Sequence, residues 1–219
     1  MQMLRIDIVS DVVCPWCYIG YRQLEKALTL MQTKVSLDIE WHPFELNRDL
    51  PVEGEAIADH LQRKYGIKPG STSDQRQQMI DLAGSLGINL QYGEGRRIFN
   101  TFKAHRILHW ARENGQQSKF QLALFEAYFE QGSNPSDLDV LMDIARGLSL
   151  DAHEVKNILA TDRYINEVRA EQKVYTSMGI QGVPTFIVDR RYPVTGAQDA
   201  VVLAQMLDKV CAASVLENT

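Results

Sequence analysis

Apolar and polar residues at the start of the chain alternate in patterns that predict a strand, a helix and a second strand. Residues 4–9, LRIDIV, form a short run rich in β-branched residues, which is typical of a buried strand. Leu24, Ala27, Leu28 and Met31 have the spacing of one helical face, which predicts a helix from the cysteines to about Gln32. From residue 35 to residue 42 the pattern has period two, as in a half-exposed strand.

Residues 45–173 have a different pattern, which predicts a series of helices and no strand. One apolar stripe runs through residues 138–145, and Asn134 and Pro135 are predicted as the N-cap and first residue of that helix. Asp151, with a glutamate three residues later, is predicted to open a further helix. This stretch is therefore predicted to be an all-helical block.

Strand character returns after Gly182. The segments VPTFIVD and RYPVTG predict two strands, and AQDAVVLAQMLDKVCAA predicts a closing helix. The order is βαβ, a helical block, then ββα. We therefore expect two domains, one α/β domain built from residues 1–44 and 174–219, and one inserted helical domain at residues 45–173.

Composition and charge limit the compartments and partners. With 219 residues, 45% hydrophobic and 23% charged, the chain is typical of soluble globular proteins. A net charge of −5 gives no general attraction to nucleic acid or to an anionic membrane, so neither is an expected partner. The N-terminus lacks the features of a secretory signal, and no apolar run reaches the length of a membrane helix. A cytoplasmic protein is predicted.

The motif CPWC carries the candidate chemistry. Pro15 suits the first turn of a helix, which places Cys14 at the helix N-terminus and Cys17 one turn further on. Unpaired N–H groups and the helix dipole favour a thiolate there, so Cys14 is predicted to be the nucleophile. Cys17 is placed to resolve a mixed disulfide. Trp16, exposed on the turn, is predicted to contact substrate.

A second motif, GVPTFIVD, supplies the other half of the candidate site. A proline directly before a β run is unusual for an interior strand, and a cis bond between Val183 and Pro184 would explain it. That geometry would leave the backbone of Val183 available to pair with an extended substrate beside Cys14.

These motifs, together with WHPFELN, NTFKAHRILHWA and VTGAQ, resemble the FrnE-type branch of the DsbA-like oxidoreductases over nearly the whole chain. The resemblance implies a thioredoxin fold, with a mixed four-stranded sheet and a large all-helical insertion. It implies thiol-disulfide exchange with protein or small-molecule thiols, with Cys14 as nucleophile, Cys17 as resolving thiol and Pro184 as the facing cis-proline. Pro15 and Val183 join the predicted substrate-binding residues. The redox-active disulfide implies no further cofactor, and glutathione is a candidate co-substrate.

Three alternatives stand beside this interpretation. The 2-hydroxychromene-2-carboxylate isomerases and kappa-class glutathione transferases are similar in architecture but typically carry serine in place of Cys14, which leaves a glutathione-dependent isomerase or transferase open. A chaperone that holds peptides on the helical block is a second. The third is a structural zinc module of Cys14, Cys17, His105 and His109, whose spacing is far from that of zinc fingers, so no metal is predicted.

The remaining polar residues are mostly interpreted as structural. Asn100 and His105 are candidates for a cleft over the active site, although a structural polar role is the commoner one on a helix. His42 is interpreted as a structural group on the polar side of its strand, and His60 and His153 as solvated. The third cysteine, residue 211, is predicted to pack as a small hydrophobic residue in the last helix.

Overall fold

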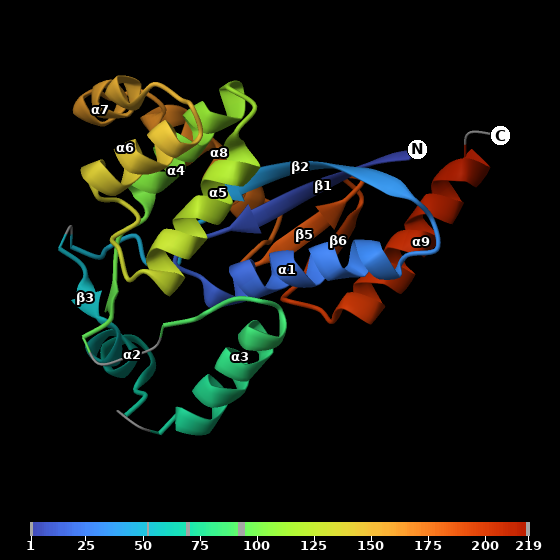
Figure 1. Ribbon diagram of the computed structural model, residues 1–219, viewed down its shortest axis with the longest axis horizontal. Coiled ribbons are helices and arrows are strands. Elements are labelled where there is room, and N and C mark those ends of the chain that lie inside the picture. Colours follow the sequence, from blue (N-terminus) through green and yellow to red (C-terminus); the bar gives the residue numbers. More distant parts are fainter. Residues whose placement is uncertain (1, 52, 69–70, 92–94, 218–219) are drawn as a thin grey trace. The chain divides into compact units, whose positions relative to one another are not determined.

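The computed structural model describes residues 2–51, 53–68, 71–91 and 95–217, and the chain divides into two compact units (Figure 1). The first, which we call the sheet unit, comprises Met1–Phe44 and Arg169–Thr219. The second, the helical unit, comprises Glu45–Val168. Within the described ranges, no helix is long and apolar enough to cross a membrane.

The sheet unit contains one sheet of four strands in the order β2-β1-β5-β6. Strand β1 pairs in parallel with β2 and antiparallel with β5, and β5 pairs antiparallel with β6. The predicted βαβ and ββα halves with a mixed four-stranded sheet are therefore confirmed. The elements are β1 (Gln2–Ser10), α1 (Pro15–Leu30), β2 (Val35–Pro43), α8 (Ile165–Ser177, which enters from the helical unit), β5 (Thr185–Val188), β6 (Tyr192–Thr195) and α9 (Ala200–Glu217).

One face of this sheet is apolar and packs against α1. A Cβ atom on Gly20 of α1 would lie 3.1 Å from the ring of Phe186, and Phe186 pairs with Ile8 of β1. The ring of Trp41 in β2 lies 5.3 Å from that of Tyr21 in α1. Because side chains alternate along a strand, the even-numbered residues of β1 face α1. Burial of each large apolar side chain here contributes about 1.5–3 kcal/mol.

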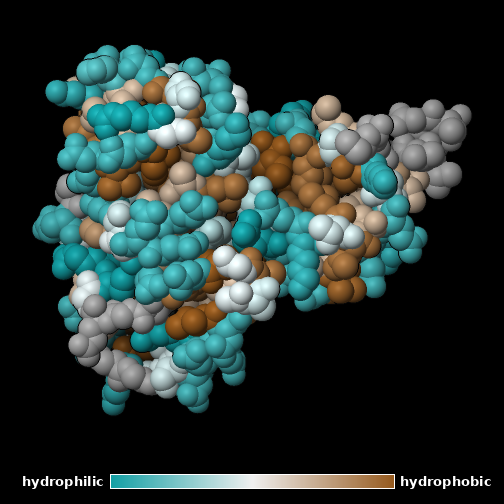
Figure 2. Space-filling view, viewed as in Figure 1, coloured by the Kyte–Doolittle hydropathy of each residue, from teal (hydrophilic) through white to brown (hydrophobic). Residues whose placement is uncertain are grey.

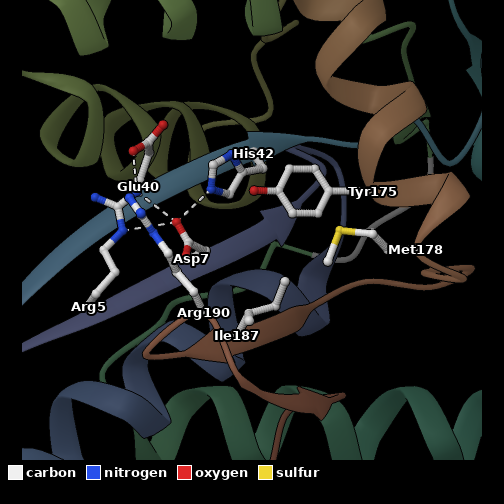
Figure 3. Close-up of a pocket in the computed structure, with 8 residues that line it drawn as sticks. All are labelled: Arg5, Asp7, Glu40, His42, Tyr175, Met178, Ile187 and Arg190. Carbon is white, nitrogen blue, oxygen red and sulfur yellow. Dashed lines mark hydrogen bonds and ion pairs between the residues drawn. The ribbon is translucent and has the colours of Figure 1, made fainter.

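The opposite face of the sheet is polar and is covered by α8. Arg5 and Asp7 of β1 and Glu40 and His42 of β2 point to this side, as Figure 3 shows. The sequence predicted alternation in β2 and a half-exposed strand. The alternation is present, but the side chain of His42 is only 6% exposed because α8 packs over it.

The helical unit contains the predicted helices and two short strands. The prediction that this block has no strand is wrong, because β3 and β4, of two residues each, form an antiparallel pair. Two residues are too few for a period-two pattern to show in the sequence. The elements are β3 (Glu55–Ala56), α2 (Ile57–Tyr65), α3 (Ser73–Ser85), β4 (Arg97–Ile98), α4 (Phe102–Glu113), α5 (Gln117–Phe125), a π-helical turn (Glu126–Glu130), α6 (Leu138–Gly147) and α7 (Ala152–Ala160).

Helix starts in this unit were predicted with mixed success. Helix α7 begins where expected, with Asp151 accepting a hydrogen bond of 2.9 Å from the N–H of His153. The predicted start of α6 at Asn134 and Pro135 is wrong, because the helix begins at Leu138 and is capped by Asp137. Asn134 instead accepts a hydrogen bond from the second residue after it, which closes a turn before the helix.

Two predictions about single residues have opposite outcomes. His60 is not solvated as predicted but is 4% exposed, because its Nδ1 lies 3.0 Å from Oε2 of Glu55 and its ring packs near Tyr65. Cys211 is buried in α9, as predicted for a small hydrophobic residue.

The first helix, α1, ends at Leu30, two residues before the predicted end.

Candidate active site

Cys14 is the N-cap residue of α1, and Pro15 is the first residue of the helix. The backbone N–H of Cys14 donates to the carbonyl of Asp11 at 3.0 Å, and that of Cys17 donates to the carbonyl of Cys14 at 3.1 Å. The first turn of α1 contains no acidic side chain, so nothing there opposes the positive end of the helix dipole. The sequence places the Cys14 sulfur where an anion is stabilised.

The two thiols differ in burial. Cys14 is 4% exposed and Cys17 is completely buried. Burial and the adjacent Cys14 thiol raise the pKa of Cys17 well above its ordinary value, while the Ser10 hydroxyl and the backbone of Asp11 act in the opposite direction. Cys17 is therefore a protonated thiol at neutral pH, and Cys14 is the more accessible of the two sulfurs.

The loop before β5 lies against Cys14. The peptide bond between Val183 and Pro184 is cis, and the Cys14 thiol donates to the Val183 carbonyl at a distance of 3.6 Å. The loop is held by the N–H of Gly196, which donates to the Pro184 carbonyl at 2.8 Å, and by the Thr185 hydroxyl. The structure thus brings together the two motifs that the sequence analysis singled out.

Gly20 allows this close approach, and the sequence analysis missed it. A Cβ atom on Gly20 would lie 3.2 Å from Cγ of Pro184 and 3.1 Å from Cζ of Phe186. Both distances are shorter than ordinary contacts between carbon atoms. The missing side chain lets α1 pack directly against the proline loop, and the signal for it was a glycine one turn after Cys17.

The other predicted site residues lie in different environments. Trp16 is 43% exposed, as expected for the turn between the cysteines. Asn100 and His105 belong to the helical unit. The Asn100 side chain accepts a hydrogen bond from the N–H of Phe102 and donates to the Arg48 carbonyl, and His105 is buried in α4. These contacts fit the structural interpretation, and a cleft role for either residue stays a prediction.

A group of ionised side chains occupies the α8 face of the sheet, and we call it the charged cluster: Arg5, Asp7, Glu40, His42 and Glu171. His42 Nε2 lies 2.9 Å from Asp7 Oδ1, and Nδ1 lies 2.5 Å from Glu171 Oε1. Arg5 donates to Asp7 and to Glu40. A cavity of about 320 Å³ opens beside them, lined in part by α8 and the end of β5 (Figure 3).

The charges in this cluster stabilise one another. Burial alone would lower the pKa of His42, but its hydrogen bonds with Asp7 and Glu171 outweigh that effect and raise it. Burial would raise the pKa of Asp7, but His42 and Arg5 lower it. Among the described residues, Glu40, His42 and Glu171 have metal-type ligand atoms within 4.8 Å of one another. These atoms already bind Arg5 or each other, so the cluster acts as an ion-pair network that joins α8 to β1 and β2.

Similarities to a protein family and to solved structures bear on this arrangement. A family model described as a DSBA-like thioredoxin domain matches residues 5–208. A probable DsbA oxidoreductase from Streptomyces coelicolor is 32% identical, with a TM-score of 0.88 over 95% of this chain and 90% of that one.

Two further solved structures share the fold at lower identity. The cytosolic disulfide reductase DsbM from Pseudomonas aeruginosa, solved with GSH, is 16% identical, with a TM-score of 0.66 over 95% of this chain and 99% of that one. A 2-hydroxychromene-2-carboxylate isomerase is 14% identical, with a TM-score of 0.69 over 96% of this chain and 98% of that one.

The resemblance drawn from the motifs is therefore confirmed at the level of the family. The family model covers most of the chain, including both cysteines and the proline loop, and the S. coelicolor protein matches it almost from end to end. This chain belongs to the DsbA-like thioredoxin-fold oxidoreductases.

Proposed function

We propose that this protein catalyses thiol-disulfide exchange through the Cys14 and Cys17 pair. The observation that carries the proposal is the position of Cys14, at the N-terminus of α1 and 3.6 Å from the carbonyl of Val183, with Cys17 buried one turn behind it. The helix end favours the thiolate that attacks, and the burial of Cys17 reserves it for the second step.

The proposed reaction proceeds through a mixed disulfide. The Cys14 thiolate attacks one sulfur of a substrate disulfide, and the other substrate sulfur leaves as a thiolate that takes a proton from water. Cys17 then gives up its proton and attacks the Cys14 sulfur, which forms the Cys14–Cys17 disulfide and breaks the mixed disulfide. The second substrate sulfur leaves as a thiolate and takes up, through water, the proton that Cys17 released. The substrate gains two electrons and the protein loses two, and the reverse sequence oxidises a dithiol substrate.

The substrate-binding residues are proposed from the surroundings of Cys14. In the part of the chain that the structure describes, the Val183 N–H donates to no group, so it is available to an extended peptide. Pairing of that backbone with a substrate strand would hold a disulfide beside the nucleophile. Pro15 and the exposed Trp16 would form the other side of the binding surface.

The substrates proposed are proteins or small molecules that contain thiols or disulfides. The shared fold of DsbM, a cytosolic disulfide reductase solved with GSH, supports glutathione as a candidate co-substrate and the cytoplasm as the compartment. The glutathione pool of the cytosol is reducing, at about −220 to −260 mV by biochemical extraction, so a couple as oxidising as DsbA, at about −120 mV, would be held reduced there. A cytoplasmic enzyme would therefore act as a reductase or isomerase.

The test is insulin-disulfide reduction with three cysteine variants. Cys14→Ser should abolish the activity, and Cys17→Ser should trap a mixed disulfide on Cys14 that non-reducing mass spectrometry detects. Cys211→Ser is the matched control, because Cys211 is also buried and lies in α9. It should keep the wild-type rate.

Two results would reject the proposal. One is an unchanged rate in Cys14→Ser. The other is a wild-type protein that exchanges no disulfide but isomerises a substrate in the presence of glutathione, which would support the isomerase alternative.

A further inference from the structure

Ser10, the last residue of β1, lies opposite Cys17 across the packed face of the sheet. The even-numbered residues of β1 face α1, and Ile8 is at the level of Gly20 through Phe186. Because β1 and β2 are parallel, the helix that connects them runs in the opposite direction to both. Two residues further along β1, about 7 Å, and three residues back along α1, about 4.5 Å, therefore lead toward the same end of the sheet, to levels within about 3 Å of each other.

The hydroxyl of Ser10 is unusual because it is buried without a nitrogen or oxygen partner. Ser10 is 2% exposed, and its Oγ makes no hydrogen bond with a nitrogen or oxygen atom of any described residue, while the Cys17 sulfur lies within its reach. Its backbone carbonyl, by contrast, accepts a hydrogen bond of 3.0 Å from the N–H of Phe44. A buried hydroxyl that lacks a partner destabilises the folded state, so its presence beside a reactive sulfur calls for an explanation.

We propose that the Ser10 hydroxyl donates a hydrogen bond to the Cys17 thiolate. This thiolate forms only when Cys17 resolves the mixed disulfide. This inference rests on the proposed function and adds a residue to it. In the thiol form, the Cys17 sulfur is a weak acceptor and leaves the hydroxyl without a good partner. In the thiolate form, the sulfur becomes a charged acceptor and the hydroxyl gains one.

The chemistry of the resolving step explains why a neutral donor suits this position. Cys17 is buried and must lose its proton, which ends on the departing substrate thiolate. Its electron pair forms the bond to the Cys14 sulfur while the substrate thiolate leaves with the pair of the broken bond. A hydroxyl stabilises the transient anion and keeps its own proton. In agreement, the Ser10 side chain lowers the pKa of Cys17 against the larger effect of burial.

The experiment titrates Cys17 by ¹³C NMR in a Cys14→Ser background, with Ser10 intact or replaced by alanine. Loss of one hydrogen bond to the thiolate should raise the pKa of Cys17 by about one unit, a tenfold smaller thiolate population at neutral pH. Because thiolate nucleophilicity rises with pKa at a Brønsted slope of about 0.4–0.5, the release of glutathione from a Cys14 mixed disulfide should slow by roughly three- to fourfold.

Two further variants make the result specific. Ser10→Thr keeps a hydroxyl and should keep the Cys17 pKa near that of wild type. Ser136→Ala removes another hydroxyl that is buried without a partner among the described residues, but from the helical unit, and should change nothing. If Ser10→Ala does not fold, Ser10→Gly removes the same hydroxyl and the same titration applies.

The outcomes separate this inference from the function on which it rests. An unchanged Cys17 pKa in Ser10→Ala, or an equal change in Ser136→Ala, overturns the role of Ser10 even if wild type reduces disulfides. If wild type exchanges no disulfide, the proposed function fails, and the titration alone still decides whether Ser10 stabilises the thiolate.

Discussion

The two faces of the sheet handle buried polar groups in opposite ways. On the α8 face, Arg5, Asp7, His42 and Glu171 are ionisable, and each pairs with a group that can carry the opposite charge. On the α1 face, the Ser10 side chain that acts on Cys17 is a neutral hydroxyl, and its Oγ has no nitrogen or oxygen partner among the described residues. Buried charges are tolerated only when they are paired, so the charged cluster is suited to attaching α8 to the sheet. A reactive sulfur needs neighbours whose hydrogen-bonding capacity is still available.

The sharpest test of this difference is Cys14→Ser, which should remove all insulin-reductase activity. Because serine is nearly isosteric with cysteine and the α8 face is untouched, the free energy of unfolding should change by less than about 1 kcal/mol. Urea denaturation and the activity assay on the same preparation check both parts. A large loss of stability would show that Cys14 serves the fold as well as the chemistry.

His42→Asn should have the opposite effects, with a large loss of stability and little change in activity. Removal of the imidazolium leaves Asp7 and Glu171 buried without their shared partner, and we expect the free energy of unfolding to fall by about 3 kcal/mol. The rate of disulfide exchange by the folded protein should stay within about twofold of wild type. The matched control is His153→Asn, at an exposed histidine in α7. A loss below 1 kcal/mol would mean that the cluster does not hold α8.

A smaller effect should appear in the pH dependence of stability. His42 has a pKa raised above 6.5, so its contribution is complete below pH 6.5 and is lost as the pH rises through the raised value. Asp7 has a pKa lowered below 3.8, so its contribution is present above that pH and is lost as the pH falls through the lowered value. The cluster is therefore most stabilising between these limits.

Glu171→Gln tests this pH window. The variant should be less stable than wild type by about 1.5 kcal/mol at pH 5.5, because one of the two carboxylates that pair with His42 is gone. The difference should narrow as the pH rises through the raised pKa of His42. Urea denaturation at half-unit steps measures it, and a constant difference from pH 5 to pH 9 would contradict the assignment of His42 as an imidazolium.

The smallest expected effect concerns Gly20. Alanine favours a helix by about 1 kcal/mol over glycine, but crowding against Pro184 and Phe186 costs about 1–3 kcal/mol, so Gly20→Ala should destabilise the protein by about 1 kcal/mol. Gly84→Ala in α3 is the control, since nothing lies within 4 Å of its Cβ position, and it should be stabilising. Equal effects of the two variants would show that α1 does not depend on the close approach.

Much of the thiol site could be predicted from the sequence because its parts are local motifs. The helix start at Pro15 and the proline loop can each be recognised from a few consecutive residues. The family resemblance indicates that the two lie together. Ser10 and Gly20 were missed, since their importance depends on which side of β1 meets α1. Their contacts, with Cys17 and with the proline loop, depend on how α1 packs on β1 and β5, which no local sequence pattern gives.

The charged cluster was not predicted from the sequence. Arg5 and Asp7 alternate with apolar residues in one strand, and Glu40 and His42 do so in the next, so parallel pairing could have placed all four on one face. Glu171, however, is 129 residues from His42, and no local pattern connects the two. His42 was therefore interpreted as a structural group on the polar side of its strand, but its partner on α8 was not predicted.

The pairing of β1 with β5 also has a consequence for synthesis. Cys14 and the Val183 carbonyl beside it are 169 residues apart, so at about 5–20 residues per second a ribosome takes roughly 8–34 seconds to make the second after the first. During that interval β2 is the only strand that can be made to pair with β1, and α1 has no α9 to pack against. The nascent chain therefore carries both thiols before the loop and the helix that pack around them in the folded protein have been made.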